Sequence, residues 1–154
     1  MPFRKILSEI FLYLIALLWL YTSVYKFLQI DNSITQLRDS PLIAPFAVWF
    51  GYGLPIIEFA LFAMLLFIRT RKYALIASIV LLTLFTLYII IILNFYRADT
   101  PCTCGGIISK LGWKNHIFFN LSFILIGIYV LIEPHIKSDK RSYCEVSIKH
   151  TLNT

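Results

Sequence analysis

The sequence predicts an all-α membrane protein whose fold class is a four-transmembrane-helix antiparallel bundle. Of its 154 residues, 59% are hydrophobic and 14% are charged, whereas soluble domains are about 45–50% apolar and about 25% charged. The apolar residues fall into four blocks almost free of charge, over about residues 6–28, 45–68, 73–96 and 113–132. A helix needs roughly 20 such residues to cross a bilayer core of about 30 Å. The short connections between the blocks imply that successive spans run antiparallel.

The first block follows Arg4 and Lys5, a basic start that is also typical of a signal peptide. It is too long for the apolar part of a signal peptide, and no small-x-small cleavage site follows it. We therefore expect a retained span. After it, Ser33-Ile34-Thr35-Gln36 has the form of a capping box and predicts a short surface helix that starts there.

The second block contains Pro55, where a bend is expected, and one charged residue, Glu58. The third and fourth blocks contain Asn94 and Asn120, which are candidates for hydrogen bonds between helices. Residues 1–134 are thus predicted to form the transmembrane domain. Residues 135–154 are predicted to be a polar cytoplasmic tail.

The basic residues predict the orientation, because Lys and Arg collect in cytoplasmic loops. Nine flank one side of the predicted membrane and five flank the other. The nine are Arg4, Lys5, Arg69, Arg71, Lys72, Lys137, Lys140, Arg141 and Lys149. Both termini are therefore expected in the cytoplasm, and the loop after the third span in the periplasm or outside the cell. We attribute the net charge of +6 to this topology and not to nucleic-acid binding.

The loop after the third span contains Pro101-Cys102-Thr103-Cys104-Gly105-Gly106. A disulfide between Cys102 and Cys104 closes a small ring, and strained, exposed disulfides exchange readily. The two glycines leave room for the backbone of a partner. This pattern favours thiol–disulfide exchange in a compartment where disulfides persist. The alternatives are inert thiols, a structural disulfide, or half of a soft-metal site. A complete four-thiolate metal site within one chain is excluded, because no further Cys faces outward.

Three other residues are candidates for the site. His116 opens the fourth span and, as an imidazolium, would lower the pKa of a nearby thiol; its alternative is an ordinary interfacial histidine. Glu58 is an acid inside an apolar block, where charges are costly and usually paired or functional. Lys26, at the outer end of the first span, is its natural partner. The pair is interpreted as a structural ion pair, with a proton relay or a contact to a quinone headgroup as the alternative.

These residues together resemble the MauE/DoxX family of redox-associated membrane proteins, and most closely its methylamine-utilisation MauE branch. The resemblance rests on Lys26, on Pro55-Ile56-Ile57-Glu58, on Cys102-Thr103-Cys104-Gly105, and on Trp113 and Asn120. It covers about residues 6–132. It implies a role beside thioredoxin-like extracytoplasmic proteins in forming, reducing or maintaining disulfides of client proteins. The DoxX side of the family implies links to quinones and sulfur compounds.

The leading hypothesis is an integral protein of the cytoplasmic membrane that exchanges disulfides through Cys102 and Cys104. Its expected partners are membrane lipid and an extracytoplasmic thioredoxin-like protein, with quinone as the candidate cofactor. The alternative is a scaffold, or a subunit that handles soft metal ions, in a larger membrane complex. These hypotheses differ in whether the two thiols are oxidised and reduced.

Overall fold

A computed structural model of the chain describes residues 2–40, 42–96 and 112–133. Within these ranges every regular element is helical, so the prediction of an all-α protein is confirmed. Four of the helices are long enough and apolar enough to span a membrane. They are α1 (Pro2–Leu28), α3 (Ala47–Leu66), α4 (Arg71–Ile91) and α6 (Gly112–Ile132).

Three shorter elements connect or extend the long helices. A nine-residue helix, α2 (Ile30–Arg38), follows α1 almost directly. A single 3-10 turn, η1 (Ala44–Phe46), leads into α3, and a π-helical turn, η2 (Ile92–Tyr96), continues α4. The helix α3 runs through Pro55 without ending there.

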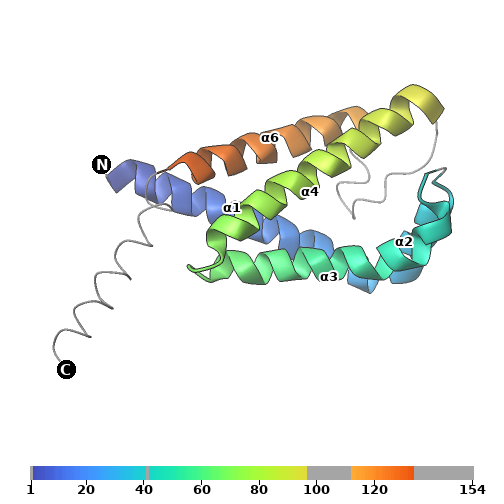
Figure 1. The fold of residues 1–154 in the computed structure, drawn as a ribbon, viewed down its shortest axis with the longest axis horizontal. Coiled ribbons are helices and arrows are strands. Elements are labelled where there is room, and N and C mark those ends of the chain that lie inside the picture. The colour runs from blue at the N-terminus through green and yellow to red at the C-terminus, as the bar shows by residue number, and fades with distance from the viewer. Residues whose placement is uncertain (1, 41, 97–111, 134–154) are drawn as a thin grey trace.

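The long helices form an antiparallel bundle, as predicted. In Figure 1, α1 and α4 run from the end of the bundle marked N to the end that carries α2, and α3 and α6 run back. The helix α1 packs against α3 and α6, and α4 packs against the same two helices. The four helices therefore close into a ring, and the inward-facing side chains of each helix pack against the helices on either side of it.

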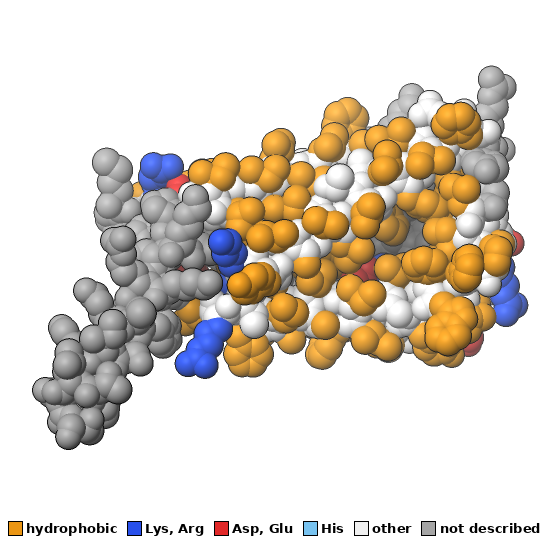
Figure 2. Space-filling view, viewed as in Figure 1, with side chains coloured by type: hydrophobic (Ala, Val, Ile, Leu, Met, Phe, Trp, Pro, Cys, Tyr) orange, Lys and Arg blue, Asp and Glu red, His pale blue; other side chains and the backbone are white. Residues whose placement is uncertain are grey.

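Much of the inside of the ring is an apolar core. Its most buried side chains include Leu12, Ile15, Leu65, Leu75 and Val130, all at most 1% exposed. The outside is also apolar: Figure 2 shows hydrophobic side chains over most of the visible face of the long helices, with charged ones toward its two ends. A soluble monomer rarely exposes so large an apolar area. This surface fits the hydrocarbon of a bilayer.

Two ion pairs, which we call the terminal ion pairs, join helices at the end of the bundle that holds the N-terminus. Arg4 of α1 contacts Glu133, which directly follows α6, at 2.8 Å, and Arg71 of α4 contacts Glu9 of α1 at 3.1 Å. Arg4 and Glu9 are at least half exposed, whereas their partners Glu133 and Arg71 are 4% and 16% exposed. Pairs of this kind contribute about 0–1 kcal/mol each, so they fix the register of the helix ends more than they stabilise the fold.

The short helix after the first span exists, but its predicted start is wrong, because α2 begins before the capping box at Ser33. Helix α2 starts at Ile30 after Gln29, whose side chain makes no capping hydrogen bond. Ser33 lies inside the helix, is buried, and donates its backbone N–H to the carbonyl of Gln29 at 2.9 Å. The reason is that only Gln29 separates the end of α1 from the start of α2. The chain therefore changes direction within one residue and continues as a helix.

Two glycines of α3 allow a test of how closely α2 packs against α3. A Cβ atom added at Gly51 would lie 2.5 Å from Cγ1 of Ile34 in α2, whereas at Gly53 it would meet nothing within 4 Å. Gly51→Val is expected to push α2 from α3 and lower the free energy of unfolding by about 1–3 kcal/mol. Gly53→Val is the matched control and should change it little. Unfolding of both variants in mixed micelles measures the difference; equal effects would contradict this packing.

Candidate functional site

Four polar side chains are buried together inside the bundle, and we call them the buried polar cluster: Lys26, Glu58, His116 and Asn120. Their exposed fractions are 6%, 4%, 3% and 3%. Lys26 comes from α1, Glu58 from α3, and the other two from α6. Burial of polar groups inside a membrane span is costly, so such a group marks a structural lock or a functional site.

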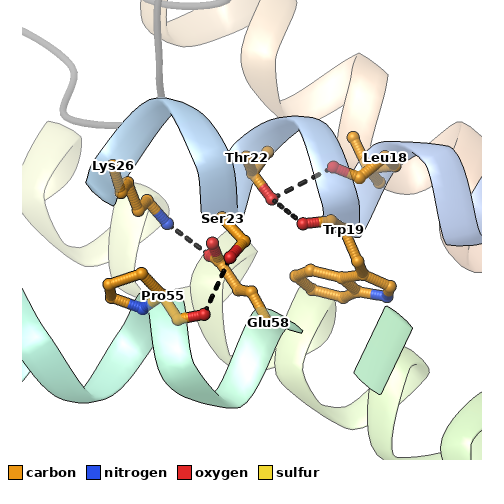
Figure 3. Close-up of polar contacts among 7 residues, drawn as sticks. All are labelled: Leu18, Trp19, Thr22, Ser23, Lys26, Pro55 and Glu58. Atoms are coloured by element: carbon orange, nitrogen blue, oxygen red, sulfur yellow. Dashed lines mark hydrogen bonds and ion pairs between the residues drawn. The ribbon is translucent and has the colours of Figure 1, made fainter. Parts of the chain in front are cut away.

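The ammonium group of Lys26 and the carboxylate oxygen Oε1 of Glu58 form a buried ion pair between α1 and α3. Figure 3 shows the two side chains pointing toward one another across the gap between these helices. Beside them, the hydroxyl of Ser23 donates a 3.0 Å hydrogen bond to the carbonyl of Pro55. The ammonium also lies 5.9 Å from the ring centre of Phe85, within the range of a cation–π interaction.

Helical spacing brings these side chains to the inside of the bundle. Trp19, Thr22 and Lys26 follow each other at intervals of three and four residues, so they share one face of α1. His116 and Asn120 are four residues apart and share one face of α6. Nε1 of Trp19 donates a 2.8 Å hydrogen bond to the hydroxyl of Ser78 in α4, and this bond holds the same face of α1 toward α4.

His116 lies between two aromatic rings. Its ring centre is 6.0 Å from that of Phe85, edge to face, and 6.4 Å from that of Phe119, nearly parallel. Its Nδ1 atom has no hydrogen-bond partner among the described residues. Nδ2 of Asn120 and Oε2 of Glu58 are also buried and also have no hydrogen-bond partner among the described residues. Buried polar atoms are normally hydrogen-bonded, and each exception calls for an explanation.

The unpartnered groups border one cavity. Its volume is about 40 Å³, and its lining includes the whole buried polar cluster together with Trp19 and Phe85. A cavity needs at least roughly 10–15 Å³ to hold a water molecule, so this one has room for water. The arrangement is a small polar chamber with aromatic walls. The residues that line it carry one unpartnered acceptor (Glu58), one unpartnered amide donor (Asn120) and one unpartnered imidazole nitrogen (His116).

The structure thus brings three of the predicted site residues together, Lys26, Glu58 and His116. Cys102 and Cys104 lie outside the described residues, as does the predicted tail. Nδ2 of Asn94 donates a 2.9 Å hydrogen bond to the carbonyl of Ile90 in the preceding turn, so among the described residues this amide bonds within its own helix and not between helices. Among the described residues, no three His, Cys, Asp or Glu side chains are grouped closely enough to hold a metal ion.

Sequence reasoning missed the contributions of Trp19, Ser78 and Phe85, and it assigned Asn120 only to contacts between helices. The spacing of Trp19 and Lys26 along α1, and of His116 and Asn120 along α6, is the signal that places each pair on one face. Ser78 and Phe85 offered no such signal, since a serine or a phenylalanine in an apolar span is common on either face.

In a comparison with protein families, the family model described as "Methylamine utilisation protein MauE" matches residues 4–133. The match includes α3, α4 and α6, all of α1 except its first two residues, and all members of the buried polar cluster. No curated protein and no solved structure matches the chain.

Proposed function

We propose that this chain, which belongs to the MauE family of multi-pass membrane proteins, exchanges disulfides with an extracytoplasmic thioredoxin-like protein through Cys102 and Cys104. The observation that carries the proposal is the position of the two thiols in the chain, between η2 and α6. The segment that contains them joins two spans whose described ends lie at the end of the bundle away from the N-terminus (Figure 1).

The charge distribution supports the orientation of this segment toward the periplasm or exterior. The N-terminus and the end of α6 lie at the same end of the bundle, together with the turn that holds Arg69 and Arg71 (Figure 1). Because basic residues favour the cytoplasmic side, we assign that end to the cytoplasm, with both termini there, and the protein to the cytoplasmic membrane. Thiols at the other face meet a compartment that allows disulfides.

The exchange itself involves two attacks. In one direction, the thiolate of one cysteine attacks a sulfur of the partner's disulfide, a mixed disulfide forms, and the partner's other sulfur leaves as a thiolate. The second cysteine then attacks the mixed disulfide, so that Cys102 and Cys104 become joined and the partner leaves as a dithiol. The reverse sequence oxidises the partner. The family description names methylamine utilisation, and we propose that the clients are proteins of that process whose disulfides need maturation.

His116 is a candidate to assist these steps. It lies four residues after the start of α6, which in a helix is a rise of about 6 Å. A base at this depth would accept a proton from an attacking thiol. Lys26 and Glu58 line the same cavity as His116, and their ion pair joins α1 to α3.

Single cysteine replacements test the exchange. Cys104→Ser leaves Cys102 without its resolving thiol, and Cys102→Ser does the reverse, so at least one variant is expected to accumulate a mixed disulfide with its partner. The adduct is measured on non-reducing gels from membranes quenched with acid, and mass spectrometry should identify a thioredoxin-like protein. A membrane-impermeant thiol reagent added from outside should label the remaining cysteine after reduction.

Cys144→Ser is the matched control, because it removes a thiol from the predicted cytoplasmic tail and leaves the pair intact. It should trap nothing. The proposal fails if neither Cys102→Ser nor Cys104→Ser gives an adduct. Stoichiometric Cu or Zn on the purified protein, in the absence of any adduct, would replace it with a metal-handling function.

A further inference from the structure

The polar chamber inside the bundle is bordered by three buried polar atoms that have no hydrogen-bond partner among the described residues. They are Oε2 of Glu58, Nδ2 of Asn120 and Nδ1 of His116. All three residues are more than nine-tenths buried. We propose that the chamber is an internal water site, in which bound water joins these atoms and links His116 of α6 to Glu58 of α3 through hydrogen bonds.

Water has the hydrogen-bonding capacity that the three atoms require. Oε2 of Glu58 accepts hydrogen bonds, Nδ2 of Asn120 donates them, and Nδ1 of His116 does either, according to the protonation of the ring. A water molecule both donates and accepts, so one kind of ligand can satisfy all three atoms. Buried water typically makes about three such bonds to otherwise unsatisfied polar groups. The cavity volume of about 40 Å³ exceeds the roughly 10–15 Å³ that a water molecule needs.

Two other polar side chains that line the chamber already have partners. The hydroxyl of Thr22 donates to the carbonyls of Leu18 and Trp19 in the preceding turn, at 3.1 and 3.3 Å (Figure 3). Nε1 of Trp19 donates to the hydroxyl of Ser78. The need for a further ligand is therefore concentrated at the three unpartnered atoms and is not spread around the wall.

The polarity and the charge of the chamber argue against other occupants. An acyl chain from the bilayer would leave all three atoms unsatisfied, and a buried polar group without a hydrogen bond is costly. Lys26, Glu58 and His116 are the titratable residues of the described lining, and Lys26 already neutralises the carboxylate of Glu58. An ion would therefore add unpaired charge, whereas water adds none.

Bound water also gives a proton a path between His116 and Glu58. Nδ1 and Oε2 make no hydrogen bond to one another, so a proton needs an intermediary to pass between them. A protonated imidazole gives its Nδ1 proton to the water oxygen, and the water gives one of its own protons to Oε2. The ring loses one proton and the carboxylate gains one, while the water and the total charge of the site are unchanged. The use of this path in thiol exchange rests on the function proposed above.

Magnetisation transfer from water tests the site directly. The ¹⁵N-labelled protein is placed in nanodiscs of deuterated lipid, and NMR follows the build-up of proton magnetisation from water at each N–H group. The side-chain amide of Asn120, assigned by its loss in Asn120→Ala, is expected to build up much faster than the backbone amide of Leu75, which is fully buried in the apolar core. A build-up at Asn120 no faster than at Leu75 would overturn the proposal.

Two double variants of equal charge test the role of Glu58. Lys26→Met/Glu58→Gln keeps a hydrogen-bonding group at this position, and Lys26→Met/Glu58→Leu replaces it with an apolar side chain. The first variant is expected to keep the fast transfer at Asn120. The second is expected to lose it, because one of the three groups that hold the water is gone. Equal transfer in the two variants would contradict the proposal.

The imidazole reports the link between the two helices. In the same two variants, the ¹⁵N chemical shift of Nδ1 of His116, assigned by its absence in His116→Phe, is expected to differ. The reason is that Nδ1 bonds to the water that the polar group at position 58 holds, and the leucine holds none. Identical shifts would show that no water links His116 to Glu58.

Cysteine variants separate the water site from the proposed function. Cys102→Ser/Cys104→Ser should keep the fast transfer at Asn120, because the groups that hold the water are Glu58, Asn120 and His116. If fast transfer persists but no mixed disulfide is ever trapped, the exchange proposal fails and the water site stands. If adducts form but Asn120 shows no fast transfer, the water site fails and the exchange stands.

Discussion

Replacing Glu58 with alanine is expected to lower the free energy of unfolding by about 3–5 kcal/mol, because it leaves the ammonium group of Lys26 buried without a counter-ion. Lys26 is only 6% exposed and ends within the bundle. Unfolding in micelles with rising SDS content measures the loss. Glu9→Ala is the comparison: it removes a half-exposed acid from one of the terminal ion pairs and leaves Arg71, which is 16% exposed. Because solvent screens the half-exposed pair, the loss should be about 1 kcal/mol, well below that of Glu58→Ala.

The double variant Lys26→Met/Glu58→Leu completes the comparison. Removing both charges deletes the desolvation cost along with the attraction, so its stability is expected within about 1 kcal/mol of the parent or above it. Equal losses for Glu58→Ala and Glu9→Ala would show that the buried pair is not a lock. A stable double variant that no longer forms mixed disulfides would show that the pair serves the chemistry and not only the fold.

Leu75→Ala is expected to have the second large effect on stability. Leu75 of α4 is fully buried in the core cluster. In soluble cores, a Leu→Ala change costs about 2–5 kcal/mol through transfer and cavity terms together. Between membrane helices, moving a leucine side chain from lipid to the core changes its free energy little, because lipid is as apolar as the core. The loss of van der Waals packing around the truncated side chain is the cost that remains. We therefore expect about 2 kcal/mol, the low end of that range, in the same SDS titration.

Leu84→Ala is the control for Leu75→Ala. Leu84 lies on the same helix, and it is 58% exposed on the face directed away from the core. Its truncation leaves no internal cavity, so stability should change by less than about 0.5 kcal/mol. A larger loss at Leu84 than at Leu75 would mean that the outward face of α4 packs against protein and not lipid.

The four-span fold was predictable because the bilayer constrains sequence strongly. Every backbone group in the hydrocarbon must be bonded within the chain, so an apolar block of sufficient length can only be a helix. The start of α2 was not predictable in the same way. A capping signal at Ser33 competes with the continuation of α1, and only the packing of Ile34 over Gly51 shows which prevails.

The candidate site was predictable in part. Glu58 stands alone in its apolar block, and Lys26 is at the right end of the first span to reach it, so their meeting could be expected before the structure was known. The bond between Trp19 and Ser78 joins residues 59 positions apart, and it depends on how α1 is rotated toward α4. No local pattern encodes that rotation, which follows from the packing of the whole core. The same holds for Asn120, whose direction depends on the rotation of α6.

The closed ring of helices also bears on the order in which the protein is made. Lys26 and Glu58 both come from the first two spans to leave the ribosome, so they can enter the bilayer as a neutral pair. Each charge alone would be costly to bury within a membrane span. His116 and Asn120 arrive with the last span, and the contact of Arg4 with Glu133 joins the earliest and latest parts of the described chain. The chamber is therefore completed only when synthesis of the helical domain ends.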